Sequence, residues 1–426
     1  MFGWTQRRAL PKDMPRRFAL ESLSEKPVSS STTTGAGGRA SLRKILLLLV
    51  FVCLSLIVAS TFFRGGERTE GGPPSFEERE NEFWGSYPEL GEGRVTYTVV
   101  PVDLEYIEEI VPIGKIGTIG HPIPTSHTYW VLARRDLGFP EDGFSKPVRA
   151  PADGVITKII FTYWAGFPDY NIYLRHTNTF MTAFYHLSEL SEGVLAKIGS
   201  PLQEGRTNEV YIPVKAGDVI GKTSSSMGQS ACLDMGAYDK KVLNFIHPEK
   251  YPLPQQHAIS PLSLFSPTLQ ERVYEKVKRT AEPRGGECDY DLRGKLSGNW
   301  FLEGTDGCTG ENGYQNYISF GYDVYDPQQL RISLGWKFLE AFGFPSWLPP
   351  LSRVEGNAPD FKNVGVSSGR IVYRLSPVRE DNIAPLPETT CTLLVEMMNE
   401  EKIRVEVFQG YIQNPSFTQK ALIYTR

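Results

Sequence analysis

The apolar positions divide the chain into one long uncharged run and two regions of short, separated runs. The uncharged run reads ILLLLVFVCLSLIVASTFF and covers residues 45–63. At about 1.5 Å rise per residue, a helix of this length reaches about 30 Å, the thickness of a bilayer's hydrocarbon core. The pattern therefore predicts a transmembrane helix over residues 44–63.

A cleaved signal peptide is the alternative interpretation of this run. It is disfavoured because 44 residues precede the run and because signal peptides carry apolar stretches of only about 7–15 residues. The preceding segment holds nine Lys and Arg against three Asp and Glu, whereas acidic residues prevail over 64–80. Basic flanks stay in the cytoplasm. We therefore expect a single-pass protein of the cell membrane, with a disordered cytoplasmic tail over 1–43 and its bulk extracytoplasmic.

Residues 64–94 are predicted to form a linker. The region 95–265 that follows has the pattern of a β-rich domain with a short internal repeat. KPVRAPADGVI at 146–156 and IPVKAGDVIG at 212–221 share Pro-Val-basic-Ala, then a Gly-containing turn, then an apolar strand. Asp-Gly and Ala-Gly-Asp are turn sequences between strands. Two such repeat motifs predict a small sandwich of β-hairpins.

The remaining chain predicts a helix with a linker over 266–285 and a second all-β domain over 286–426. Ser266 and Pro267 suit the start of a helix, and apolar residues then recur at four-residue spacing. Strand-like runs separated by Gly, Pro, Asn and Asp follow, which favours a barrel or a sandwich. These runs are 296–302, 317–324, 330–336, 369–375, 392–397, 403–408 and 421–424. We expect the apolar stretch over 337–350 either to pack in the core or to cap a barrel mouth or contact a membrane or partner.

Charge and cysteine content narrow the functional classes. The chain has 45 Lys and Arg against 49 Asp and Glu, a formal charge of −4, so it lacks the basic footprint of a nucleic-acid-binding protein. Four cysteines lie in the predicted outer domains, where an oxidising environment permits disulfides, and the sequence leaves three pairings open. They are Cys232, Cys288, Cys308 and Cys391.

Candidate chemistry is concentrated in three short stretches. GHPIPTSH holds His121 and His127, FYHLSEL holds His186 after an apolar strand, and SACLDMGAYD holds Cys232 and Asp234. Residues i and i+2 of a strand share one face. We therefore expect Cys232 and Asp234 to point together into a cleft.

Taken in order, these stretches give residues 117–240 a resemblance to the lysostaphin-type, LytM-like endopeptidase domain, which has the duplicated hybrid motif fold. The resemblance rests on four motifs that follow the family's order and spacing. It implies a mainly β fold, a LytM-like β-hairpin sandwich, and a zinc site acting on cell-wall peptides. The motifs are APADGVI at 150–156, YHLSEL at 185–190, PVKAGDVIGKT at 213–223 and CLDMGAYD at 232–239.

The resemblance also implies roles for particular residues and shows where this chain departs from the family. His127 matches the first zinc-binding histidine, and Asp234 stands where the family has its last zinc-binding histidine. His186 matches a catalytic histidine, and Cys232 replaces the other one. The family's aspartate ligand is replaced by Val131. His121 is a spare candidate metal ligand.

Three functions remain open on this evidence. We expect a degenerate, non-hydrolytic LytM-like domain without a cofactor, which binds cell-wall glycan or peptide or regulates an envelope protein. The second is a zinc metalloendopeptidase with a rearranged ligand set of His127, Asp234 and either Cys232 or His186. The third is a carrier of an apolar ligand, because Gly298-x-Trp300 resembles the opening strand of lipocalin-like barrels and small barrels can hold one ligand.

Overall fold

The structure is a computed structural model that describes residues 75–117, 121–132, 145–164, 167–223, 232–309, 315–344, 351–379, 382–385 and 390–426. Within these ranges, no helix is both long and apolar enough to cross a membrane. The predicted cytoplasmic tail and transmembrane helix, residues 1–63, lie outside the described residues.

The first described helix, α2 (Phe76–Trp84), lies within the segment predicted to be a linker. Ser75 caps it through a capping box with Glu78, which satisfies backbone groups that the first turn leaves without partners. Trp84 is fully buried, and the guanidinium of Arg175 lies 5.5 Å from the Trp84 ring centroid and 4.9 Å from that of Tyr87. These cation–π contacts attach the segment to the first sheet.

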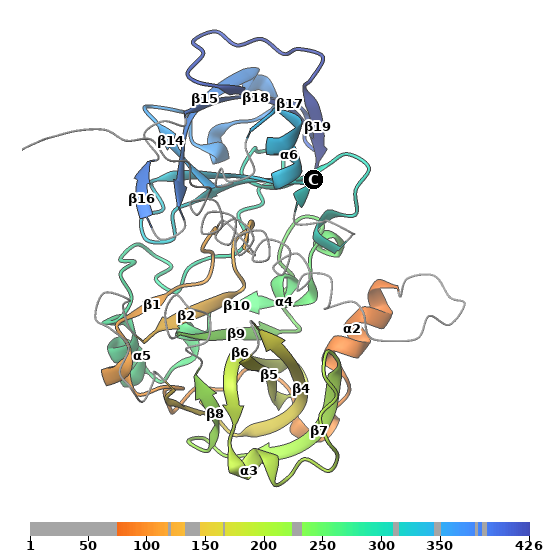
Figure 1. The fold of residues 1–426 in the computed structure, drawn as a ribbon, viewed down its shortest axis with the longest axis vertical. Helices are drawn as coiled ribbons and strands as arrows, with labels where there is room; N and C mark the ends of the chain where they lie inside the picture. The colour runs from red at the N-terminus through yellow and green to blue at the C-terminus, as the bar shows by residue number, and fades with distance from the viewer. Residues whose placement is uncertain are drawn as a thin grey trace, which may run out of the picture. The chain divides into compact units, whose positions relative to one another are not determined.

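That first sheet contains ten antiparallel strands, and seven of them follow one another in the order β1-β2-β9-β6-β5-β4-β7 (Figure 1). Strand β10 pairs with β9, and β8 pairs with both β3 and β6. The strands are β1 (Glu109–Val111), β2 (His127–Val131), β3 (Pro147–Arg149), β4 (Gly154–Trp164), β5 (Phe167–Thr177), β6 (Phe180–Leu190), β7 (Thr207–Val214), β8 (Val219–Thr223), β9 (Cys232–Asp239) and β10 (Ala258–Ile259).

The two repeat motifs pair with each other in this sheet. Strand β4 of the first pairs with β7 of the second, and β3 pairs with β8. Their turns are joined as well, because the Ala216 N–H donates to Asp153 Oδ1 at 2.9 Å and the Ala150 N–H donates to the Asp218 carbonyl at 2.9 Å. The two strands of each motif therefore pair with the strands of the other motif, and the predicted hairpins within each motif are not formed.

Short helices connect the strands of the first sheet and lead to the second. The predicted helix after residue 266 is confirmed as α5 (Pro267–Tyr274), although the Ser266 side chain makes no capping hydrogen bond. The other short elements are η1 (Pro88–Leu90), η2 (Leu104–Tyr106), α3 (Glu192–Leu195), η4 (Pro248–Lys250), α4 (Leu253–Gln256) and η5 (Pro261–Leu264).

The second sheet closes into an eight-stranded antiparallel barrel in the order β14-β13-β12-β11-β19-β18-β17-β15, with β15 pairing back to β14. Each of the seven predicted runs overlaps one of its strands, and closure selects the barrel over the sandwich. The strands are β11 (Gly298–Leu302), β12 (Tyr317–Tyr322), β13 (Leu330–Leu334), β14 (Leu351–Glu355), β15 (Arg370–Arg379), β17 (Cys391–Asn399), β18 (Lys402–Gln409) and β19 (Leu422–Thr425), with β16 (Asn382–Pro385) beside β15.

Aromatic side chains fill the barrel. Trp300 on β11 is fully buried, its Nε1–H donates to the Leu296 carbonyl at 2.9 Å, and the Arg426 guanidinium lies 4.2 Å from its ring centroid. Phe361, from η8 (Phe361–Asn363), is fully buried and packs edge-on against Tyr373. These contacts form one continuous core inside the barrel.

The apolar stretch over 337–350 enters this core where it is described. Helix α6 (Trp336–Ala341) buries Phe338, whose ring centroid lies 5.7 Å from that of Tyr424 on β19. Of the alternatives for this stretch, packing in the core is therefore confirmed for its first part. Residues 345–350 lie outside the described residues.

The four cysteines of the predicted outer domains are free thiols in the described part of the chain. Cys288, Cys308 and Cys391 are buried, and Cys232 is partly buried. The three candidate disulfide pairings are therefore not formed, and the three buried cysteines act as small apolar groups in the core.

Candidate functional site

The candidate site lies in the first sheet where β9 runs between β2 and β6. Asp234 on β9 stands directly opposite Tyr129 on β2 and opposite Tyr185 on β6. Residues directly opposite in neighbouring strands present their side chains on one face. The register thus brings a buried carboxylate between two tyrosines.

His127 joins this row from β2. Its Nε2 lies 3.6 Å from Asp234 Oδ2, a contact too long for a hydrogen bond, and Nε2 is buried with no hydrogen-bond partner. The His121 ring centroid lies 5.0 Å from that of His127. Three of the residues singled out from the sequence therefore meet in one place.

Cys232 and Asp234 point together, as their spacing predicts. The Cys232 thiol donates to Asp234 Oδ1 at 3.5 Å. Burial, and next the charge of Asp234, raise the pKa of the Cys232 thiol well above its usual range. A thiol held in its neutral form is a poor nucleophile, so this cysteine is suited to orienting the carboxylate.

His186 is held in an unusual backbone conformation on β6. Its φ of 61° lies in the left-handed region, which costs a non-glycine residue of the order of 1 kcal/mol. Two residues of β5 hold it there, because the His186 N–H donates to Asn171 Oδ1 at 3.0 Å and its Nδ1 lies 3.1 Å from Asp169 Oδ1. Asp169 and Asn171 were missed in the sequence analysis. Their only local signal is an Asp-x-Asn pair directly before the apolar residues 172–174 of the same strand.

Burial and neighbouring charges divide the ionisable groups of the site into charged and neutral ones. Burial lowers the pKa of His186, but the hydrogen bond and charge of Asp169 prevail and raise it to about 9. Burial raises the pKa of Asp234 to about 6, lowers that of His121 to about 4, and lowers that of His127 well below its usual range. At neutral pH, His186 is therefore a cation, Asp234 is largely ionised, and the other two histidines are neutral.

Lys115 is a further member of the site that the sequence analysis missed. Its Nζ lies 5.3 Å from the Tyr129 ring centroid. Its positive charge lowers the pKa of His121, His127, Asp234 and Cys232. Nothing in the local pattern marks it, because it lies in the loop IGKIG, outside every motif.

A pH titration of His186 tests this electrostatic arrangement. We expect its imidazole to titrate near pH 9 in NMR spectra of the full chain, and Asp169→Asn to lower the pKa by about 2 units or more. Since the folded-state pKa exceeds the unfolded value of about 6.5, the stability contribution of His186 is complete below that pH and is lost as the pH rises through the folded value. A wild-type midpoint at or below that of an unfolded peptide would contradict the arrangement.

The described residues of the site place two candidate metal ligands together but not a third. Among the described residues, no group of three His, Cys, Asp or Glu side chains is arranged to hold a metal ion. His127 Nε2 and Asp234 Oδ2 do converge, and Nε2 has no other hydrogen-bond partner. Val131, where the family resemblance places a third ligand, lies opposite Cys232 in the sheet.

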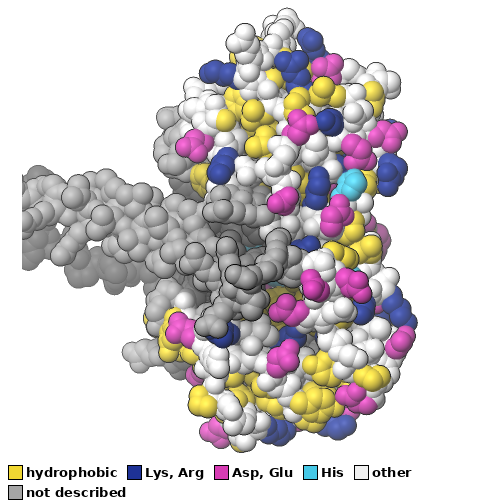
Figure 2. Space-filling view, turned by 90° about the vertical axis from the view of Figure 1, so that its right-hand side faces the viewer, with side chains coloured by type: hydrophobic (Ala, Val, Ile, Leu, Met, Phe, Trp, Pro, Cys, Tyr) yellow, Lys and Arg dark blue, Asp and Glu magenta, His cyan; other side chains and the backbone are white. Residues whose placement is uncertain are grey.

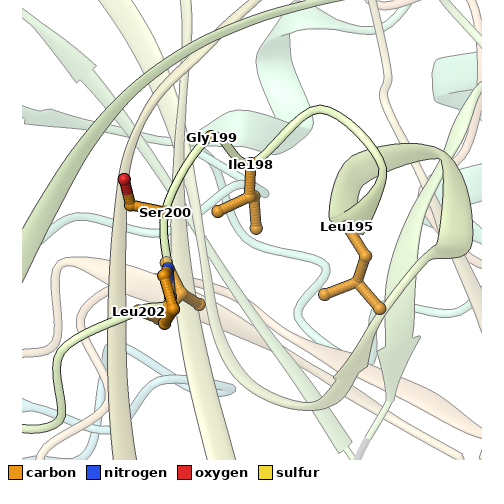
Figure 3. Close-up of a pocket in the computed structure, with 6 residues that line it drawn as sticks. Leu195, Ile198, Gly199, Ser200 and Leu202 are labelled. Carbon is orange, nitrogen blue, oxygen red and sulfur yellow. The ribbon is translucent and has the colours of Figure 1, made fainter.

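A separate surface hollow of about 370 Å³ lies in the segment after α3, lined by Leu195, Ile198, Leu202 and their neighbours (Figure 3). Its lining comes from one short stretch of chain and includes no residue of the candidate site. On the molecular face drawn in Figure 2, acidic and basic side chains are interspersed. That face therefore carries no extended basic patch of the kind that binds nucleic acids.

Comparison with known proteins gives weak and partial similarities. A family model described as "Borealin: Cell division cycle-associated protein 8" matches residues 170–249, well under half of the chain. No curated protein matches the chain.

Two solved structures show distant similarity. One is a zinc-containing peptidase from Vibrio cholerae, with 16% identity and a TM-score of 0.22, covering 34% of this chain and 37% of that one. The other is lysostaphin, with 13% identity and a TM-score of 0.22, covering 71% of this chain and 80% of that one. The chain thus spans little more than a third of the first structure's length, and TM-scores this low establish no common overall fold.

Proposed function

We propose that this chain is a membrane-anchored, extracytoplasmic protein whose LytM-like domain has lost peptidase activity. In this proposal, the domain acts as a binding or regulatory module of the cell envelope. The observation that carries it is the site itself, where His127 Nε2 and Asp234 Oδ2 converge at 3.6 Å but Val131 stands at the third ligand position.

The ligand count argues against a hydrolytic zinc site. A catalytic zinc ion takes three protein ligands and keeps a fourth position open for water or substrate. The two remaining candidates for the third ligand have other contacts, because the Cys232 thiol donates to Asp234 and His186 is paired with Asp169. A protonated imidazole has no lone pair for a metal, so recruiting His186 requires the loss of its Nε2 proton, which its raised pKa of about 9 opposes.

The pairing of the two repeat motifs with each other and the order of the motifs support the LytM-like assignment. The APADGVI and PVKAGDVIG turns face each other across β4 and β7, and the candidate site lies on the neighbouring strands β2, β6 and β9. Membrane anchoring is supported by the uncharged run at 45–63 and by its basic preceding flank. The choice of envelope glycan or peptide as ligand rests on the family resemblance.

The second and third functions of the sequence analysis receive less support. A zinc peptidase requires a ligand that the described residues do not place. A carrier of apolar ligands requires free space in the barrel, whereas Trp300, Phe361 and Phe338 pack into its core.

The proposal is tested by the zinc content of the purified full chain and by assays on envelope peptides and glycans. We expect less than about 0.1 zinc per chain without chelator, no cleavage of peptide crosslinks, and measurable binding to envelope polymer. One zinc per chain, lost together with cleavage in Asp234→Ala, would overturn the proposal. So would a metal-free chain that binds neither envelope polymer nor an envelope protein.

A gain-of-ligand variant tests the ligand count independently. Val131→Asp adds a carboxylate on the strand that carries His127, and we expect it to tighten zinc binding by about tenfold or more, since a third ligand completes a zinc set. Val131→Asn is the matched control, because it has nearly the same shape but no charge. Equal zinc affinity of the two variants would contradict the assigned role of this position.

A further inference from the structure

We propose that the face of β4 and β5 beneath residues 82–87 is a binding site for an anionic group, a carboxylate or a phosphate, of an envelope polymer. In this proposal, residues 75–87, the cover segment, lie over the site and are displaced when the polymer binds. The inference rests on the proposed function and deepens it, because it names the charge of the ligand and the surface that binds it.

Two cations share this face of the sheet. Arg175 and Tyr173 lie two residues apart on β5, so their side chains lie on one face. Lys158 on β4 stands directly opposite Tyr173, which places its side chain on the same face and makes it a diagonal neighbour of Arg175. Arg175 is 0% exposed and Lys158 is 7% exposed.

The cover segment contacts both cations. The Arg175 guanidinium lies 5.5 Å from the Trp84 ring centroid and 4.9 Å from that of Tyr87. Lys158 Nζ donates to the backbone carbonyl of Glu82. All three of these partners belong to the cover segment, so its displacement uncovers both cations.

Among the described residues, no carboxylate forms an ion pair with Arg175. Its Nε is buried without a hydrogen-bond partner, and its terminal nitrogens reach only the Asn178 carbonyl at 3.4 Å and Met181 Sδ at 3.6 Å. A buried cation without a counter-ion is costly, and the two aromatic rings compensate for only part of that cost. An anionic group that replaces the rings gains charge-assisted hydrogen bonds, because the guanidinium donors match the geometry of carboxylate and phosphate.

The acidic residues nearby are engaged elsewhere. Glu80 Oε1 lies 3.3 Å from Nε2 of His257, and Glu82 contributes its backbone carbonyl to Lys158. Glu209 on β7 stands opposite Lys158 in the register, but within the described ranges neither Glu82 nor Glu209 forms an ion pair with that lysine. The positive charge of the face therefore remains available to a ligand.

The contacts of the cover segment allow it to leave without unfolding of the sheet. Trp84 is the one buried residue of α2. The chain that follows is held separately, because the Asn178 N–H donates to the Gly91 carbonyl at 2.7 Å and Thr177 Oγ1 donates to the Gly93 carbonyl at 2.7 Å. The cover segment can therefore be displaced while the chain stays attached at the turn between β5 and β6.

Calorimetric titration of full-length variants with sodium polyphosphate and with poly-L-glutamate tests the site. We expect Arg175→Met, which keeps an apolar stem between the rings, to weaken binding of the tighter probe by about tenfold or more. We expect Trp84→Ala to tighten it by about tenfold, because a larger fraction of the molecules is then uncovered.

The matched control is Arg404→Met, because the Arg404 guanidinium likewise lies over an aromatic ring, 4.5 Å from the Phe417 centroid. Circular dichroism confirms that each variant folds. An affinity of Arg175→Met within twofold of that of the control would overturn the inference.

Hydrogen exchange of the wild type tests the displacement without any substitution. An isolated helix as short as the nine residues of α2 is not stable in water. We therefore expect saturating amounts of the tighter probe to raise the exchange rates of the α2 amides by about tenfold or more, whereas the amides of β17 keep their rates. Exchange in α2 that is unchanged or slower with the probe bound would overturn the inference.

The outcomes separate this inference from the proposed function. Arg175-dependent polyanion binding with displacement of α2, in a chain that holds zinc and cleaves envelope peptides, would remove the proposed function and leave the anion site. Binding of a neutral envelope glycan by a metal-free chain that binds neither polyanion would remove the anion site and leave the proposed function.

Discussion

Trp300→Ala is expected to lower the free energy of unfolding by about 3–5 kcal/mol, the usual cost of truncating a fully buried tryptophan. The ring is 0% exposed on β11, its Nε1–H bonds to the Leu296 carbonyl, and Arg426 lies over its face. Truncation leaves a cavity in the barrel core beside the pairing of β11 with the final strand β19. Urea unfolding followed by circular dichroism measures the loss.

The control for this variant is Met398→Ala at the end of β17, where the side chain is 52% exposed. We expect its effect to stay within about 0.5 kcal/mol, as for other surface substitutions. A Trp300→Ala effect no larger than that of the control would show that barrel closure does not depend on this ring.

Gly221→Val is expected to destabilise the first sheet by about 3 kcal/mol, because it forces side-chain atoms into a tightly packed position. A Cβ at residue 221 would lie 2.5 Å from the Glu189 carbonyl oxygen and 3.1 Å from Leu187 Cδ1. Gly221 belongs to β8, which pairs with β3 to join the two repeat motifs and also pairs with β6. Thermal unfolding of the full chain measures the effect.

Gly199→Val is the matched control, since a Cβ at residue 199 would meet no atom within 4 Å. It introduces the same β-branched side chain on a loop. If both variants lower the midpoint of thermal unfolding equally, the close approach at Gly221 is not what requires glycine there.

The strands of the barrel were largely predictable, and their closure was not. Each predicted run overlaps a strand because alternating or continuous apolar residues bounded by turn residues are a local signal. Strand β14 was missed, since its five residues, LSRVE, are mostly polar and follow directly on the apolar stretch over 337–350. Its pairing with both β13 and β15 closes the barrel, so the choice between barrel and sandwich depended on a strand without a local signature.

In the candidate site, too, some contacts were predictable from the sequence and others were not. The pairing of Cys232 with Asp234 follows from two-residue spacing in a strand and is confirmed. Asp169, Asn171 and Lys115 come from other segments and reach the site only through strand register and loop packing. Their local sequence carries at most a weak signal.

The sequence by itself determined the mainly β composition, the paired turn motifs, the helix after residue 266 and the residue types at the centre of the site, because each is set by neighbours a few positions away. It also predicts a membrane-spanning run and a departure from the family's ligand set at Val131. The tertiary structure alone decided barrel closure, the free state of the described cysteines and the charges around Asp234. These depend on distances between residues far apart in the chain, and burial then sets which groups carry charge.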